Sequence, residues 1–264
     1  MPRYPVDPHY TYSNIFKIFK IPHYSSSADL VSSDVINNIH IFSPTWPTPA
    51  GRAPAGRTTN KCMLSSISIH GVLHAATDVL RITPFGLASE LTNETTQYPT
   101  NKVFTSAWRF MVIKWNPYLN QSQPTQQDIF LWFYHTFVYY GEYALETDEQ
   151  PNKPSAHCNL MRMSTDYTGT FQIIADKRFW LTADKPRVEI SWQVPLNERA
   201  TFDPDATDAV PPVTPLYSVV IIPPFSLDDF DQITREYITE RLTSSTQKRL
   251  AAFSGITKLN FIDL

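Results

Sequence analysis

Glycine and cysteine are scarce in this sequence, and each scarcity excludes a class of protein. Only 7 of the 264 residues are glycine, which argues against glycine-rich phosphate-binding loops and against flexible glycine-rich linkers. The 2 cysteines, Cys62 and Cys158, are too few for a disulfide framework. One bridge stays possible, but two reduced, buried thiols fit better and indicate synthesis inside a cell.

Charged residues are also few. They make up 18% of the chain, against about 25% in an average globular domain. The net charge is −3 with neutral histidines, so the chain is not a globally basic nucleic-acid-binding protein. The 16 Phe, 13 Tyr and 6 Trp create large apolar faces that must be covered. A large sandwich core covers such faces, and so do contacts with other subunits.

Long apolar runs and long proline-free segments are missing as well. No segment is apolar for long enough to span a bilayer, and residues 1–20 lack the continuous apolar core of a signal peptide. We therefore expect no membrane span. The 22 prolines exclude a mostly helical chain, because proline breaks helix interiors. They suit strands joined by long, stiffened loops.

The motifs of common catalytic and metal sites do not occur. The sequence has no His-Glu-x-x-His, no Cys-x-x-Cys, no Gly-x-Ser-x-Gly and no phosphate-binding loop. His70 and His74 share one face of a predicted strand but lie too far apart for easy co-ligation of one ion. His157 and Cys158 are adjacent and would point to opposite faces of a strand. We expect no catalytic site, no cofactor and no metal site, and predict that the protein is not an enzyme.

One group of acidic residues could form a cation site. Asp203, Asp205 and Asp208 alternate along the acidic, proline-rich stretch 201–215, but this stretch lacks the glycine and distal glutamate of a calcium loop. We interpret it as an exposed loop. A cation held between neighbouring subunits remains an alternative.

Eight strands are predicted from residue alternation and from apolar, β-branched composition. They lie at 63–74, 103–115, 129–140, 170–182 (two short strands around a turn at Ala175–Lys177), 187–195, 216–222 and 257–263. For 129–140 the period does not exclude a helix. Strands of this number joined by long loops predict an all-β sandwich or jelly roll.

One helix is expected near 226–242. Ser226 can cap its first turn, and Arg241 suits the negative end of the helix dipole. The acids Asp228, Asp229 and Asp231 are better explained as residues of that first turn than as a cation site. Since it lies between the last two predicted strands, this helix is an insertion on the β scaffold.

Residues 1–60 are rich in Ser, Thr, Asn and Pro, and we interpret them as an extended arm that precedes a shell domain at 61–264. The run 14–21 can pair as a strand or lie in a groove. Residues 1–61 carry six basic and three acidic residues, a charge of 6 − 3 = +3, so the rest carries −6. The candidate nucleic-acid contacts are Arg3, Lys17, Lys20, Arg52, Arg57 and Lys61.

Aromatic residues of the arm admit two roles. Tyr4, Tyr10, Tyr12, Phe16 and Phe19 can stack on unpaired bases. The alternative, which we favour, is that they anchor the arm on a neighbouring subunit.

The order of five segments resembles a known family. The segments are KCMLSSISIHGVL at 61–73, WRFMVIKW at 108–115, FQIIADKRFWLT at 171–182, PLYSVVII at 215–222 and KLNFID at 258–263. In this order they resemble the single jelly-roll capsid proteins of small, circular, Rep-encoding single-stranded DNA viruses. The resemblance covers residues 60–264. It implies an eight-stranded single jelly roll of two packed four-stranded antiparallel sheets, with the inserted helix near 226–242.

The resemblance also implies a function and partners. The protein would assemble with itself into an icosahedral shell of about 60 copies or more, enclose a single-stranded DNA genome, and meet a host receptor. It would be found in the virion and, during assembly, in the host cell, with the nucleus one possible compartment. Many relatives begin with an arginine-rich arm, and this chain departs from that pattern, which leaves genome neutralisation by the arm without support.

Two other functions fit the same predicted fold. One is the capsid protein of a small RNA virus or satellite, because nothing in the strands distinguishes DNA from RNA. The other is a lectin-like or receptor-binding β-sandwich. Exposed aromatic residues in loops would favour the latter, and Tyr98, Trp115 and Tyr118 are the candidates.

Overall fold

The structure is a computed structural model, and it describes nine segments of the chain. They are residues 9–20, 38–49, 55–75, 105–116, 123–129, 169–182, 185–205, 210–223 and 249–264. The helix predicted near 226–242 lies outside the described residues, and so does the His157–Cys158 pair. Of the strand predicted at 129–140 only Ile129 is described, at the end of a helical turn that begins at residue 126.

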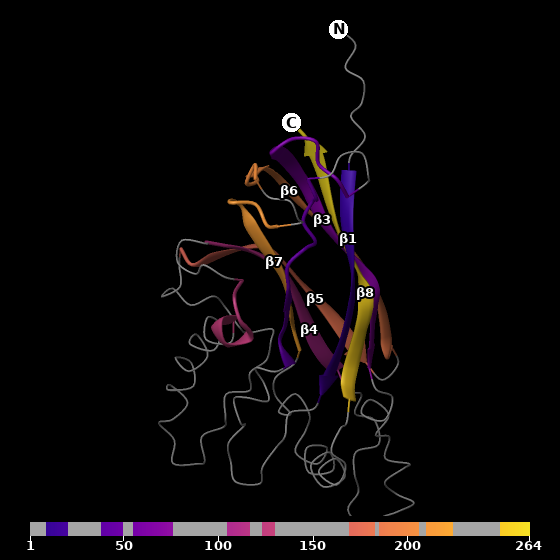
Figure 1. Cartoon of the computed structure of the whole chain (residues 1–264). Helices are drawn as coiled ribbons and strands as arrows, with labels where there is room; N and C mark the ends of the chain where they lie inside the picture. Colours follow the sequence, from indigo (N-terminus) through magenta and orange to yellow (C-terminus); the bar gives the residue numbers. More distant parts are fainter. Residues whose placement is uncertain are drawn as a thin grey trace, which may run out of the picture.

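Eight strands form two antiparallel sheets (Figure 1). They are β1 (His9–Lys20), β2 (His40–Phe42), β3 (Lys61–Ala75), β4 (Thr105–Trp115), β5 (Phe171–Thr182), β6 (Arg187–Thr201), β7 (Leu216–Ile222) and β8 (Arg249–Asp263). The strand order is β1-β8-β3-β6 in one sheet and β2-β7-β4-β5 in the other. We call these the β1 sheet and the β2 sheet. Successive strands alternate between the sheets except at β4–β5, and this wrapping makes the sandwich a jelly roll, as predicted.

The predicted boundary at residue 60 does not separate an arm from the sandwich. β1 pairs with β8 along its whole length, from His9 opposite Phe261 to Lys20 opposite Arg249, and Figure 1 shows the two strands side by side in indigo and yellow. β2 pairs with β7. The run 14–21 therefore takes the strand alternative, and both sheets depend on residues before Lys61.

Strand β5 corrects a second expectation. The predicted turn at Ala175–Lys177 is absent, and Phe171–Thr182 is one continuous strand. A β-bulge lies there instead, because Val112 pairs with Ala175 and Ile113 with Ile173. The charged run resembles a turn in sequence, but its first member, Asp176, accepts hydrogen bonds from Arg109.

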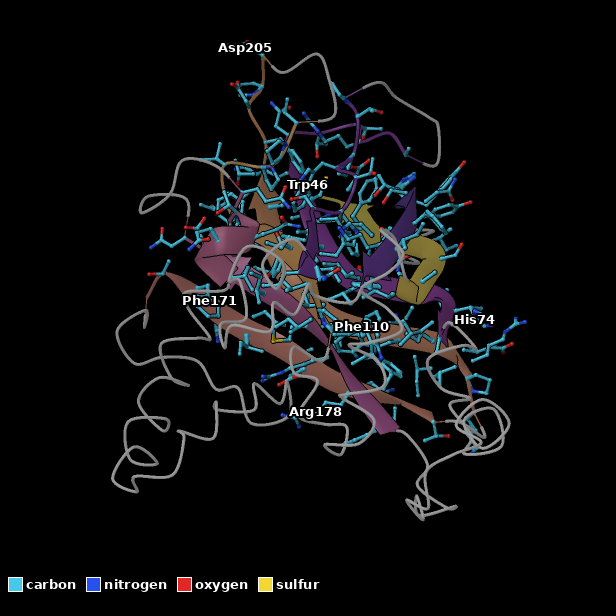
Figure 2. All side chains as sticks on the ribbon, turned by 90° about the horizontal axis from the view of Figure 1, so that it is seen from below. Trp46, His74, Phe110, Phe171, Arg178 and Asp205 are labelled. Carbon is cyan, nitrogen blue, oxygen red and sulfur yellow. The ribbon has the colours of Figure 1, made fainter. Side chains whose placement is uncertain are left out.

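Inward-facing aromatic rings fill the space between the sheets. Phe110 of β4 packs edge-on against Phe179 at 5.1 Å and against Phe253 of β8 at 5.4 Å. Phe19 of β1 packs edge-on against Trp108 at 4.7 Å. Figure 2 shows Phe110 among the crowded side chains at the centre of the molecule. Each of these residues is at most 9% exposed, so the rings join the sheets into one core.

Candidate functional site

Metal-ligating side chains do not gather into a site in the described part of the chain. No group of three or more metal-ligating side chains occurs among these residues. His70 lies exposed on β3 with its Nδ1 3.2 Å from Ser191 Oγ. The carboxylate of Asp203 accepts the backbone N–H of Asp205 at 3.0 Å, and Figure 2 shows Asp205 far from His74. No helix within the described ranges is long and apolar enough to cross a membrane.

The predicted nucleic-acid contacts do not converge on one site. Arg3 and Arg52 lie outside the described residues, and of Lys20 only the backbone is described. Lys17 pairs in register with Phe253, and Phe253 with Leu73. Lys61 lies 12 residues before Leu73 on β3, so Lys17 and Lys61 are roughly 40 Å apart along the sheet.

Arg57 has a structural position. It is 2% exposed, and its Nη1 donates to Thr59 O at 2.9 Å and to Asn60 Oδ1 at 3.0 Å. Its guanidinium lies 4.5 Å above the ring of Phe202. Within the described residues, its Nε and Nη2 have no hydrogen-bond acceptor. The side chain closes the turn before β3 and does not present its charge to solvent.

The outer faces of the two sheets differ in exposure. On the β2 sheet, every residue of β7 is buried, and Met111 and Ile113 of β4 are 0% exposed. Arg109 is 4% exposed on that face and is bound by Asp176, with Nε 2.9 Å from Oδ1. On the β1 sheet, residues of the outer face reach solvent in all four strands. Within the described strands, the β2 sheet is open only toward β5, where Trp180 is 49% exposed, whereas the open outer face of the β1 sheet extends across all four of its strands.

Basic residues dominate that open surface. Adjacent residues of a strand point to opposite faces, so Arg199 and Lys258 point outward beside the buried residues Ala200 and Leu259. The described charged side chains of the outer face are the cations Lys61, Arg187, Arg199 and Lys258 and the acid Glu189. Among described side chains this gives 4 − 1 = +3 on a chain whose net charge is −3. Arg187 lies 3.5 Å from Glu189, so the other three cations have no acid beside them on this face.

Exposed aromatic rings lie on the same surface. β1 alternates buried Thr11, Ile15 and Phe19 with exposed residues, and the exposed series includes Tyr12 at 63% and Phe16 at 65%. Ile256 of β8 is 39% exposed in the neighbouring strand. Lys258 Nζ lies 4.1 Å over the ring of Tyr10. We define the basic–aromatic face by these residues: Tyr10, Tyr12, Phe16, Lys61, Arg187, Glu189, Arg199, Ile256 and Lys258.

Polar side chains fill the middle of the basic–aromatic face. Ser66 Oγ accepts from Gln193 Nε2 at 3.0 Å and from Asn260 Nδ2 at 2.9 Å. These bonds connect β6, β3 and β8 across the outer surface. The centre of the sheet is thus hydrogen-bonded and hydrophilic, while its β1 side is aromatic.

A charged cluster connects the two sheets on the inside. Lys114 of β4 donates to Glu198 of β6 at 2.5 Å, and the Tyr217 hydroxyl of β7 donates to the other carboxylate oxygen. Burial alone would raise the pKa of Glu198, but the hydrogen bonds from Lys114 and Tyr217 outweigh it and the pKa is lowered. Burial and the same Glu198 raise the pKa of Tyr217. The cluster holds the sheets together and has the character of a structural contact.

Two further titratable groups are structural residues, Cys62 buried and His40 half-buried. The Cys62 thiol is free, 0% exposed and donates to Asp263 at 3.4 Å, which agrees with the predicted reduced state. Burial, with the Asp263 hydrogen bond, raises its pKa to about 12, so the thiol is not a reactive nucleophile. Burial, with the charge of Lys17, lowers the pKa of His40 to about 4.

No model of a protein family matches the chain, and no curated protein matches it.

The basic–aromatic face was missed in the sequence because its members lie in four separate strands. Strand periodicity gives the face of each residue within its own strand, but Arg199 and Lys258 come to lie on one common face only through the pairing of β6, β3 and β8. One local signal existed. On β1, Tyr10, Tyr12 and Phe16 are at even positions and therefore on one face, whereas Ile15 and Phe19 are at odd positions on the opposite face. This alternation indicates an amphipathic strand with aromatic residues outward.

Proposed function

We propose that this protein is a capsid protein that assembles with itself into an icosahedral shell around a single-stranded DNA genome. The observation that carries the proposal is the jelly-roll topology, with strand orders β1-β8-β3-β6 and β2-β7-β4-β5. The five sequence segments that resemble capsid proteins of small circular single-stranded DNA viruses fall on β3, β4, β5, β7 and β8 in the same order.

The fold suits a repeated building block. Rigid sandwiches can assemble through loops and faces without opening their sheets, and closed point-group symmetry then produces a shell. The rings of Phe110, Phe179 and Phe253 and the inter-sheet cluster at Glu198 make the sandwich stiff. A stiff unit keeps its contact surfaces in fixed orientation, as a shell of many copies requires.

A non-enzymatic role is part of the same proposal. Among the described residues, Cys62, Glu198 and Tyr217 have shifted pKa values and form structural contacts inside the sandwich. Their partners are Asp263 and Lys114, and each is satisfied without a substrate.

Electron microscopy of the purified chain tests the proposal, with the absorbance ratio at ~260 and ~280 nm read on the same fraction; nucleic acid raises this ratio because it adds absorbance that aromatic residues do not supply. We expect closed particles of uniform size. A chain that stays monomeric or forms only small oligomers at high concentration, across salt and pH, would contradict the shell. In that case a receptor- or glycan-binding sandwich becomes the better assignment.

A further inference from the structure

We infer that the basic–aromatic face of the β1 sheet binds single-stranded nucleic acid and faces the genome in the assembled shell. This inference rests on the proposed function for its biological setting. The binding itself is a property of the single subunit, and it can be measured whether or not particles form.

Charge is the first argument. The face carries +3 among its described side chains while the whole chain carries −3, so the remainder of the molecule is acidic. Positive charge gathered on one face of an acidic protein is the electrostatic pattern of a polyanion-binding surface. Arg199 and Lys258 lie on the same face of the sheet, two rows of paired residues apart, because Arg199 pairs with Met63 and Lys258 with Ser68. The row of Ser66 and Asn260 lies between them.

Exposed rings are the second argument. Tyr12 and Phe16 are separated by one outward residue, Asn14, so their Cα atoms are about 13 Å apart on one strand. At 63% and 65% exposed, both rings have surface free for bases to stack upon. Aromatic residues on an open sheet beside basic side chains form the usual platform for unpaired bases, whereas a duplex hides its bases.

The same observations argue against a second copy of the chain on this face. A two-fold contact would bring Arg199 and Lys258 of one subunit toward the same cations of the other, and like charges in an interface cost several kcal/mol. The centre of the face is also hydrogen-bonded and polar, at Ser66, Gln193 and Asn260. A subunit contact would favour an apolar centre with a polar rim.

Binding of a fluorescent oligo-dT to the full chain, below the concentration at which particles form, tests the inference. Y12S/F16S removes both rings, and R199Q/K258Q removes two cations. The matched controls are W180S, an exposed ring on β5 of the other sheet, and K185Q, an exposed cation before β6. We expect Y12S/F16S to weaken binding on the order of tenfold or more. R199Q/K258Q should reduce the slope of log affinity against log salt by about 1.4.

The result that overturns the inference is oligo-dT binding by both double variants equal to that of the wild type and the controls. Loss of particles by Y12S/F16S with unchanged oligo-dT affinity would also overturn it and assign the rings to a subunit contact. Failure of every protein, wild type included, to form particles would contradict the shell alone, because the oligo-dT measurement still decides the face. Thermal unfolding of each variant verifies folding, which exposed positions should preserve.

Discussion

Two of the few glycines face each other at the centre of the β1 sheet. Gly71 of β3 pairs directly with Gly255 of β8, and the Phe253 ring lies over both. A Cβ on Gly255 would come 2.4 Å from the backbone oxygen of His70 and 3.0 Å from Phe253 Cζ. Phe253 in turn packs on Phe110 of the other sheet. The absence of two side chains therefore makes room for a ring that joins both sheets.

Substitution of Gly255 by alanine should destabilise the sandwich. The new methyl group meets backbone at His70, which no side-chain rotation relieves, so β3 and β8 must separate or Phe253 must move. We expect a loss of about 1–3 kcal/mol in the free energy of unfolding, the usual cost of overpacking. Thermal or denaturant unfolding measures it. The matched control is S254A, at an exposed position on the same strand, and equal stability of the two variants would contradict the role given to the glycine pair.

At the scale of elements, one carboxylate adds a polar link between the two sheets. Glu198 of β6 receives Lys114 from β4 and Tyr217 from β7. Because its pKa is lowered from the ordinary 4.5, the folded state favours the ionised form. The stabilisation is therefore fully present above about pH 4.5 and is lost as the pH falls through the lowered folded pKa.

Glu198→Gln should reduce stability at neutral pH and flatten its dependence on acid. The neutral amide still accepts from Tyr217 but loses the ion pair with Lys114, and we expect a loss of about 0.5–1 kcal/mol because the pair is partly exposed. Unfolding measured between pH 7 and pH 3 checks this. His40, with its pKa lowered to about 4, titrates in both proteins, so it cancels in the difference. Glu189→Gln, 80% exposed, is the control. A difference that stays constant down to pH 3 would contradict the assigned role of Glu198.

Strands with a clear residue alternation were predictable from the sequence. Strands whose neighbouring residues resemble a loop or a turn were not. The alternation at 63–74 and the apolar run at 216–222 gave β3 and β7, because strand period and β-branched composition are local properties. β1 was ambiguous because its flanks are rich in proline and serine, and only its pairing with β8 decides between strand and arm. β5 was divided in two because Ala175–Lys177 resemble a turn, whereas Arg109, the residue that binds Asp176 in the continuous strand, is 67 residues away from it.

The whole molecule determines the candidate surface in the same way. Lys17, Arg57 and Lys61 all lie within the first 61 residues of the chain. In the fold, however, Lys17 is on β1, Arg57 is in a buried turn and Lys61 is the first residue of β3. Arg199 and Lys258 share one face of a sheet only because β6 and β8 both pair with β3. Residue types and strand parity were accessible from the sequence. The strand order, which decides what lies side by side, was not.

Each sheet contains one strand from the residues before Lys61, β1 in one sheet and β2 in the other. The stability of the sandwich should therefore depend on the N-terminal segment. β1 contributes Ile15 and Phe19 to the core, at 7% and 0% exposed, and supplies a 12-residue partner for β8. Burial of two such side chains is worth about 1.5–3 kcal/mol each, a large part of a typical folding free energy of about 5–15 kcal/mol.

A chain that begins at Ile21 should therefore unfold at a much lower temperature than the full chain or aggregate through the uncovered β8, because an unpaired strand edge recruits other chains. Circular dichroism during heating and light scattering measure the two outcomes. A peptide of residues 9–20, which is β1 alone, should restore the transition when added in excess, since it returns both the ladder and the inward rings. Were residues 1–20 only an arm, the shortened chain would melt as the full chain does and the peptide would change nothing. That result would separate β1 from the cooperative unit, which its pairing with β8 and the contact of Phe19 with Trp108 now define.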